Sequence, residues 1–247
     1  MKSLGLYVIF IGNLFKRMES FRTYASLTLN ECIKVGYNSV FIVTVISLFM
    51  GAVTTIQVAY NLVSPFIPDL IIANVARDMT LLELSPTIIG LVFAGKIGSN
   101  IASELGTMRI TEQVDALEVM GINATSYLVL PKIVASLIMF PMLVIISMFL
   151  TLIGGYFAGT MVGVISGTDF ISGIRLNFVP FAIYFAIIKA IAFSFVVASL
   201  SAFKGFYIKG GALEVGVAST TAVNNSCIGI LAADYVLANL LAQYLGA

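Results

Sequence analysis

Four charged residues lie within stretches of sequence that are otherwise apolar enough to cross a membrane. They are Glu83, Lys96, Lys189 and Asp234. A charge at the centre of a bilayer costs about 2.5 to 3.5 kcal/mol on insertion scales, so each one needs a partner or a function. Carboxylate and ammonium groups in such places pair with one another, carry protons or ions, or contact the polar end of a ligand.

Lys189 and Asp234 carry opposite charges deep in two separate apolar segments. Pairing would lower the cost of burying both, so the sequence predicts an intramembrane charge pair with a structural or gating role. Glu83 lies near the end of its segment, where it would line a cavity, contact a headgroup or lie at the interface. Lys96 is expected to extend toward the headgroups. An ion-coupled secondary transporter that uses Glu83, Lys189 and Asp234 is the alternative interpretation.

The residues that most enzymes and metal sites need are missing or misplaced. The chain has no histidine, and Cys32 and Cys227 stand far apart. Gly90–Lys96 matches the start of a phosphate-binding P-loop, but Ile97 replaces the Ser or Thr that would hold magnesium. The sequence therefore predicts no enzyme, no metal site and no cofactor in this chain. If transport is driven by ATP, the ATP and its Mg²⁺ belong to a partner.

Composition identifies the class of protein in which these residues are placed. Hydrophobic residues make up 60% of the 247 and charged residues only 10%, whereas soluble domains are about 45 to 50% apolar. The 13 basic residues are spread along the chain, which does not favour nucleic acid as a partner. We expect an all-α integral membrane protein.

The apolar runs predict five transmembrane helices in one domain that covers residues 1–247. Each run reaches about the 20 residues that a bilayer requires. Before them, residues 3–26 keep a helical period but are interrupted by charges such as Lys16 and Arg17, which predicts an interfacial amphipathic helix. The spans are predicted at about 39–63, 80–102, 133–163, 178–203 and 225–244.

Small residues recur every four positions in two of these spans. Ala94, Gly98 and Ala102 leave one face of the second span almost without side chains, and Gly155 and Gly159 begin a similar series in the third. Such faces allow another helix to approach closely. The spacing therefore predicts helix packing at both places.

A short amphipathic helix is predicted at 107–120, between the second and third spans. Val114 and Leu117 share one face of it, acidic residues occupy the others, and Gly121 is suited to end it. With the N-terminus in the cytoplasm, two basic residues outside the spans, Arg77 and Arg175, lie on the far side. Nine lie on the cytoplasmic side, as the positive-inside rule favours: Lys2, Lys16, Arg17, Arg22, Lys34, Arg109, Lys132, Lys204 and Lys209.

Four consecutive motifs make the sequence recognisable. Ala94–Gly98 reads AGKIG, Glu104–Arg109 reads ELGTMR, Thr111–Gln113 reads TEQ and Glu118–Gly121 reads EVMG. Their order resembles the MlaE family of ABC-transporter permeases, and the resemblance extends from about Gly36 to near the C-terminus. In that family this loop is the coupling helix that sits in a groove of the cytoplasmic ATPase. The resemblance thus implies that ATPase coupling involves Glu104, Arg109, Glu112, Asp115 and Glu118.

The resemblance also suggests a lipid-binding cavity. Leu81–Pro86 is similar to the family motif LRELGP, whose glutamate, here Glu83, lies close to that cavity. Leu82 and Ser85 stand where the family usually has arginine and glycine, so any role of that arginine is absent or displaced. Gln57 is a second cavity candidate by the same resemblance.

Partners and location follow from the resemblance as expectations. It implies a homodimer that works with a cytoplasmic ABC ATPase and a periplasmic MCE-domain protein. The implied substrate is phospholipid that moves between the inner and outer membranes of a bacterium. The chain would lie in the inner membrane, with its N-terminus in the cytoplasm and its C-terminus in the periplasm.

Overall fold

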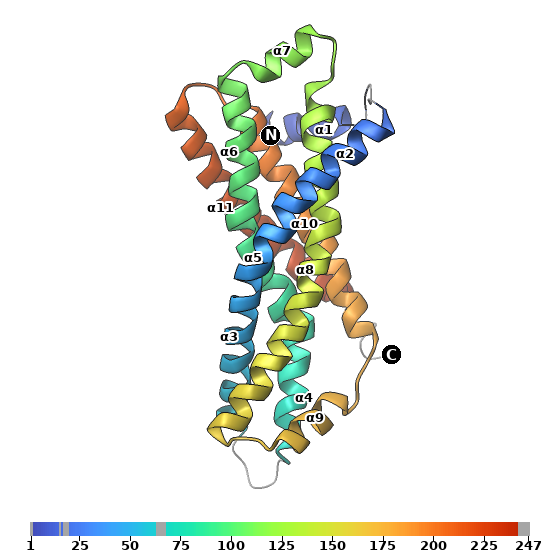
Figure 1. Ribbon diagram of the computed structural model, residues 1–247, viewed down its shortest axis with the longest axis vertical. Helices are drawn as coiled ribbons and strands as arrows, with labels where there is room; N and C mark the ends of the chain where they lie inside the picture. Colours follow the sequence, from blue (N-terminus) through green and yellow to red (C-terminus); the bar gives the residue numbers. More distant parts are fainter. Residues whose placement is uncertain (1, 15, 17–19, 63–67, 242–247) are drawn as a thin grey trace. The chain divides into compact units, whose positions relative to one another are not determined.

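The computed structural model describes residues 2–14, 16, 20–62 and 68–241, which Figure 1 shows as helices joined by short connections. No β-strand occurs among these described residues. Five of the described helices are long and apolar enough to cross a membrane, which confirms the predicted all-α, five-span class. They cover Phe21–Asn61, Leu70–Ile110, Ala124–Val162, Phe181–Phe206 and Ala212–Leu240.

The N-terminal region contains two helices where the sequence predicts one. Helix α1 (Lys2–Asn13) ends well before residue 26, and α2 (Phe21–Cys32) begins a new helix. Ser20 has an extended backbone and its hydroxyl accepts a hydrogen bond from the Thr23 N–H, so it acts as an N-cap that separates the two. Helix α2 then continues through the π-helical η1 (Ile33–Tyr37) into α3 (Asn38–Asn61).

The predicted second span, 80–102, is the middle of a longer helical run. Arg77, expected outside the spans, lies instead within the first helix of this run. Two parts of the run are π-helical, and one of them contains Pro86; a proline ring crowds the carbonyl four residues earlier, and a wider turn relieves that contact. The run consists of α4 (Leu70–Met79), η2 (Thr80–Ile88), α5 (Ile89–Phe93), η3 (Ala94–Gly98) and α6 (Ser99–Ile110).

The remaining helices differ from the predicted spans mainly because they continue into polar flanks. Hydropathy marks only the apolar part of a helix, whereas the helix itself ends where its hydrogen bonding is interrupted. Gly163, with φ of 75°, directly follows the third long helix. Residues 242–244 of the predicted fifth span lie outside the described residues. The helices are α7 (Gln113–Val119), α8 (Ala124–Val162), α9 (Gly167–Arg175), α10 (Phe181–Phe206) and α11 (Ala212–Leu241).

The chain forms two compact units, each built from three segments. The first unit comprises Met1–Asn38, Gly90–Phe140 and Ile191–Ala233. Within it, Ala94 and Ala102 are completely buried, and a Cβ on Gly205 of α10 would lie 2.6 Å from the Ala102 carbonyl oxygen. Helix α10 therefore packs directly on the small-residue face, as predicted for Ala94, Gly98 and Ala102.

The second unit comprises Ser39–Ile89, Pro141–Ala190 and Asp234–Ala247. Helices α4 and α9 lie side by side in it (Figure 1). The side chains of Ile72, Ala73 and Phe170 are buried between them. Arg77, only 2% exposed, donates to the carbonyl oxygens of Ile174 and Leu176 at 2.6 and 2.8 Å. Its guanidinium thus satisfies carbonyls that the end of α9 leaves free.

Helices α3 and α8 approach each other closely in the same unit. A Cβ on Gly154 would overlap the Leu48 carbonyl, and one on Gly51 would overlap the Thr151 carbonyl. Ser47 donates a 2.8 Å hydrogen bond to Ser147 beside this contact. The contact confirms helix packing as the use of the glycines in the third span, since Gly155 also lies against Gly51 and Thr55.

Replacing Gly154 by alanine is expected to destabilise the protein by about 1 to 3 kcal/mol, because the obstacle is backbone that has no rotamer to change. The free energy of unfolding can be measured in detergent by circular dichroism. Gly216→Ala is the matched control, since nothing lies within 4 Å of a Cβ at that helical position. Equal stability of the two variants would contradict the close approach of α3 and α8.

Candidate functional site

Lys189 contacts two other predicted site residues in the second unit, Glu83 and Asp234. Its ammonium lies 2.8 Å from Glu83 Oε1 and 2.8 Å from Asp234 Oδ1. The contact with Asp234 is an ion pair without hydrogen-bond geometry. The Phe185 ring adds a cation–π contact, with its centroid 4.8 Å from Nζ. The structure therefore brings Glu83 into the pair that the sequence predicts for Lys189 and Asp234.

Lys189 has a further partner in η2. Its ammonium donates to the Leu82 carbonyl at 3.0 Å. This carbonyl lies in the π-helical segment that contains Pro86, and π-helical turns often occur at functional sites.

Exposure differs strongly along this cluster. Lys189 is 0% exposed and the Asp234 side chain 18%, whereas the Glu83 side chain is 49% exposed. Glu83 is therefore the end of the cluster that another molecule can reach. The Gln57 amide of α3 is also exposed, and the hydrogen bonds of the described residues do not include it. Both predicted cavity residues thus present polar groups at the surface of the second unit.

Helix α7 differs from the predicted 107–120 helix at its start. Residues 107–110 belong to α6, and Thr111 and Glu112 form a turn in which Glu112 has φ of 61°. The Thr111 hydroxyl donates back to the Thr107 carbonyl at 2.8 Å, which satisfies one of the carbonyls at the end of α6. The sequence pattern did not reveal this turn because Thr and Glu are not typical helix breakers.

The end of α7 follows the prediction for Gly121. Gly121 has φ of 81°, its N–H bonds to the Glu118 carbonyl, and the Ile122 N–H bonds to the Leu117 carbonyl, both at 3.0 Å. This is a Schellman motif. Asn123 then caps α8 through a bond from the Ser126 N–H, and its amide donates to the carbonyls of Asn13 and Lys16 at 2.9 and 2.6 Å. The exit from α7 is thereby bonded to the end of α1.

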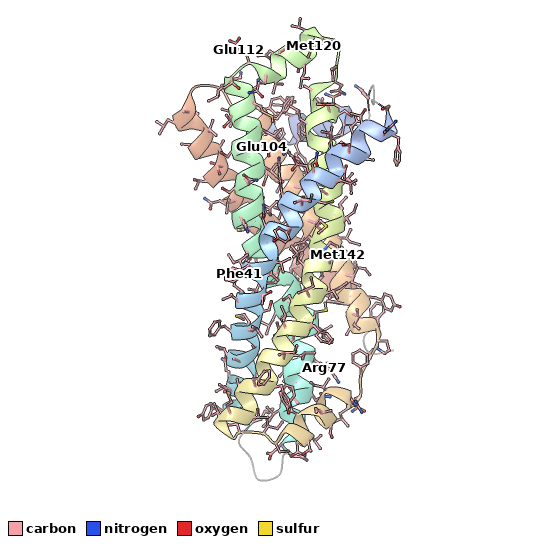
Figure 2. All side chains as sticks on the ribbon, in the orientation of Figure 1. Phe41, Arg77, Glu104, Glu112, Met120 and Met142 are labelled. Atoms are coloured by element: carbon pink, nitrogen blue, oxygen red, sulfur yellow. The ribbon has the colours of Figure 1, made fainter. Side chains whose placement is uncertain are left out.

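The exposed surface of α7 is partly apolar. Val114 is completely buried, but Val119 is 88% exposed and Met120 65%. Figure 2 shows Glu112 and Met120 at opposite ends of the helix. Asp115 accepts a 2.6 Å bond from Arg109 of α6, while Glu112, Asp115 and Glu118 are exposed. The structure thus joins Arg109 to Asp115 and leaves Glu112 and Glu118 exposed on the same short segment, which also exposes two apolar side chains that the sequence prediction missed.

Glu104 lies apart from that group, on α6 (Figure 2). Its carboxylate lies 2.5 Å from Lys132 of α8 and 3.1 Å from Lys34 of η1. Glu31 of α2 completes a four-residue charge cluster, 3.0 Å from Lys34 and 3.1 Å from Lys132. This placement favours a structural role, in which the cluster links α2, α6 and α8, over direct contact of Glu104 with a partner. The sequence marks Lys132, because it borders a long uncharged run, but it does not show that Lys132 meets Glu104.

Lys96 and the P-loop-like segment lie in helical structure. Residues 90–96 belong to α5 and η3, so their backbone does not form the loop of free N–H groups that a nucleotide phosphate needs. The Lys96 ammonium donates to the Asn38 carbonyl at the start of α3. Among the described residues, no three His, Cys, Asp or Glu side chains are grouped to hold a metal ion.

Comparison with known proteins gives consistent matches over almost the whole chain. Residues 28–240 match the family described as Permease MlaE. A probable ABC transporter permease protein of Rickettsia prowazekii (strain Madrid E) is 34% identical over 239 residues, 97% of this chain and 92% of the relative. A second, from Synechocystis sp., is 33% identical over 236 residues, 95% and 89% of the two chains. Protein Trigalactosyldiacylglycerol 1, chloroplastic, of Arabidopsis thaliana is 32% identical over 252 residues, 98% and 69% of the two.

Proposed function

The chain belongs to the MlaE permease family, and from this premise we propose that it moves phospholipids between the inner and outer membranes of a bacterium. As an ABC transporter permease it is a multi-pass membrane subunit and is not itself the ATPase. Hydrolysis of ATP therefore takes place in a partner subunit. The family membership favours this energy source over the ion gradient of the alternative interpretation.

The lipid substrate is supported by the nature of the chain and of one relative. The Arabidopsis relative is named after a galactolipid, trigalactosyldiacylglycerol. In this chain, apolar helices offer surfaces suited to acyl chains, and exposed Gln57 and Glu83 offer polar groups for a headgroup. We propose that the chain works as a homodimer in the inner membrane, together with a periplasmic MCE-domain protein. The excess of basic residues favours a cytoplasmic N-terminus.

Helix α7 is the observation that carries the coupling proposal. It is a short helix between two long apolar ones, anchored by buried Val114 and capped at Gly121, with Val119 and Met120 exposed. Exposed apolar side chains with an acidic surround are typical of a small docking surface. In the proposed mechanism the ATPase binds α7. The helices before and after it, α6 and α8, then transmit the movement of the ATPase to the lipid site.

Replacing both Val119 and Met120 by aspartate is expected to weaken binding of the ATPase at least tenfold, because two exposed apolar anchors are lost. The dissociation constant can be measured with the purified chain in nanodiscs and its ATPase. Leu213→Asp is the control, since Leu213 is 80% exposed on α11 of the same unit. Unchanged affinity in the double variant, or equal weakening in the control, would argue against α7 as the coupling helix.

Alanine at Gln57 or Glu83 is expected to lower the phospholipid that co-purifies with the chain about threefold, the effect of one lost hydrogen bond. Bound lipid is quantified by mass spectrometry against protein. Asp169→Asn serves as the control, because this carboxylate belongs to the same unit but is bonded to Ser166. Unchanged lipid in both alanine variants would mean that these residues do not contact the substrate.

A further inference from the structure

The cluster around Lys189 carries more negative than positive charge. Two carboxylates, Glu83 and Asp234, face one ammonium. The ammonium has three N–H donors, and it has three oxygen neighbours: Glu83 Oε1, Asp234 Oδ1 and the Leu82 carbonyl. Because Lys189 is also 0% exposed, a phosphate group has no free path to its ammonium.

The other cations of the second unit do not change this balance. The unit holds three basic residues and five acidic ones. Arg77 is 2% exposed and donates to Asp78 and to two α9 carbonyls. Arg175 is exposed at the end of α9. Both buried cations in the described part of the unit, Arg77 and Lys189, are thus already bonded to acceptors of the chain.

The accessible atom of the cluster is an acceptor. Glu83 uses Oε1 for Lys189, and its second oxygen has no bond among the described residues. An ionised carboxylate oxygen accepts hydrogen bonds and repels anions. A phosphodiester brought to this point would meet a cluster with an excess of negative charge, whereas a primary ammonium would supply both the opposite charge and N–H donors.

We propose that Glu83 binds the primary ammonium of an aminophospholipid headgroup, of the ethanolamine class. This inference rests on the proposed function, because it assumes that a phospholipid reaches Glu83. A choline headgroup carries the charge but no N–H donor, so it interacts less well. A glycerol headgroup lacks the charge altogether.

The test offers the purified full-length chain a mixture of equal amounts of phosphatidylethanolamine, phosphatidylcholine and phosphatidylglycerol. After repurification, the bound lipids are quantified by mass spectrometry. The wild-type chain is expected to bind phosphatidylethanolamine about threefold more than phosphatidylglycerol, the size of one partly exposed ion pair. In Glu83→Gln the ratio should fall to about one, and in Glu83→Asp it should stay near the wild-type value.

Asp169→Asn is the matched control, since it removes an equal charge elsewhere in the unit and should leave the ratio unchanged. A wild-type ratio of one or less, or an unchanged ratio in Glu83→Gln, would overturn the inference. Lipid bound without preference contradicts only the ammonium site, whereas a wild-type chain with no bound lipid contradicts the proposed function as well. Should Glu83→Gln fail to fold, the wild-type ratio alone still decides.

Discussion

Replacing Lys189 by methionine is expected to lower the free energy of unfolding by about 3 kcal/mol. The change keeps most of the side-chain volume but leaves Asp234, 18% exposed, without its cation. Breaking a buried ion pair costs about 3 to 5 kcal/mol. The lower end applies here because Glu83 is half exposed and water can solvate it. Unfolding can be followed in detergent by circular dichroism during titration with denaturant.

Two further variants make this result specific. Lys204 lies on the same helix, and no carboxylate is bonded to it in the described structure. Lys204→Met should therefore change the free energy of unfolding little. Combining Lys189→Met with Asp234→Asn should restore part of the lost stability, since the uncompensated charge is removed. If the two substitutions simply add, the residues are not coupled, and the pair does not stabilise the fold.

Lys132→Met is expected to have the second largest effect, about 2 to 3 kcal/mol. Lys132 is 4% exposed and lies between the carboxylates of Glu31 and Glu104. The cost falls below the usual value for a broken buried pair because Lys34 continues to neutralise both carboxylates. The free energy of unfolding is measured as for Lys189.

Because the cluster of Glu31, Lys34, Glu104 and Lys132 links several helices, we expect Lys132→Met to impair transport as well as stability. With Lys132 removed, α2, α6 and α8 lose a shared contact, so ATP hydrolysis and lipid movement should become less tightly coupled. The measurement is the ratio of lipid transferred to ATP hydrolysed, with Lys209→Met as an exposed control. Adding Glu104→Gln to Lys132→Met should partly restore stability. A normal ratio in a destabilised variant would limit the cluster to a structural role.

The class of fold was predictable because it depends on composition and length. Long apolar runs leave the backbone no alternative to helices in a membrane, so five spans follow from hydropathy alone. The helix ends were less predictable. The break at Ser20 and the turn at Glu112 involve single local hydrogen bonds, and the π-helical run around Pro86 contains one proline. An average over 20 residues does not detect features this local.

The candidate sites were predictable only one residue at a time. Intramembrane charge singled out Glu83, Lys189 and Asp234, but their joint contact depends on how η2 and α10 pack. Similarly, an amphipathic pattern located α7, yet that pattern did not reveal that Val119 is exposed while Val114 is buried. The sequence also gave no sign that Glu104 and Lys132 meet, since they lie on separate helices.

The bonds from the Asn123 amide to the carbonyls of Asn13 and Lys16 have a practical consequence for handling the protein. A deletion that reaches Asn13 or Lys16 would remove the two acceptors that hold the exit of α7, however far these residues are from Asn123 along the chain. Shortened versions of the chain for transport assays should therefore keep all of α1 and the residues that follow it up to Lys16.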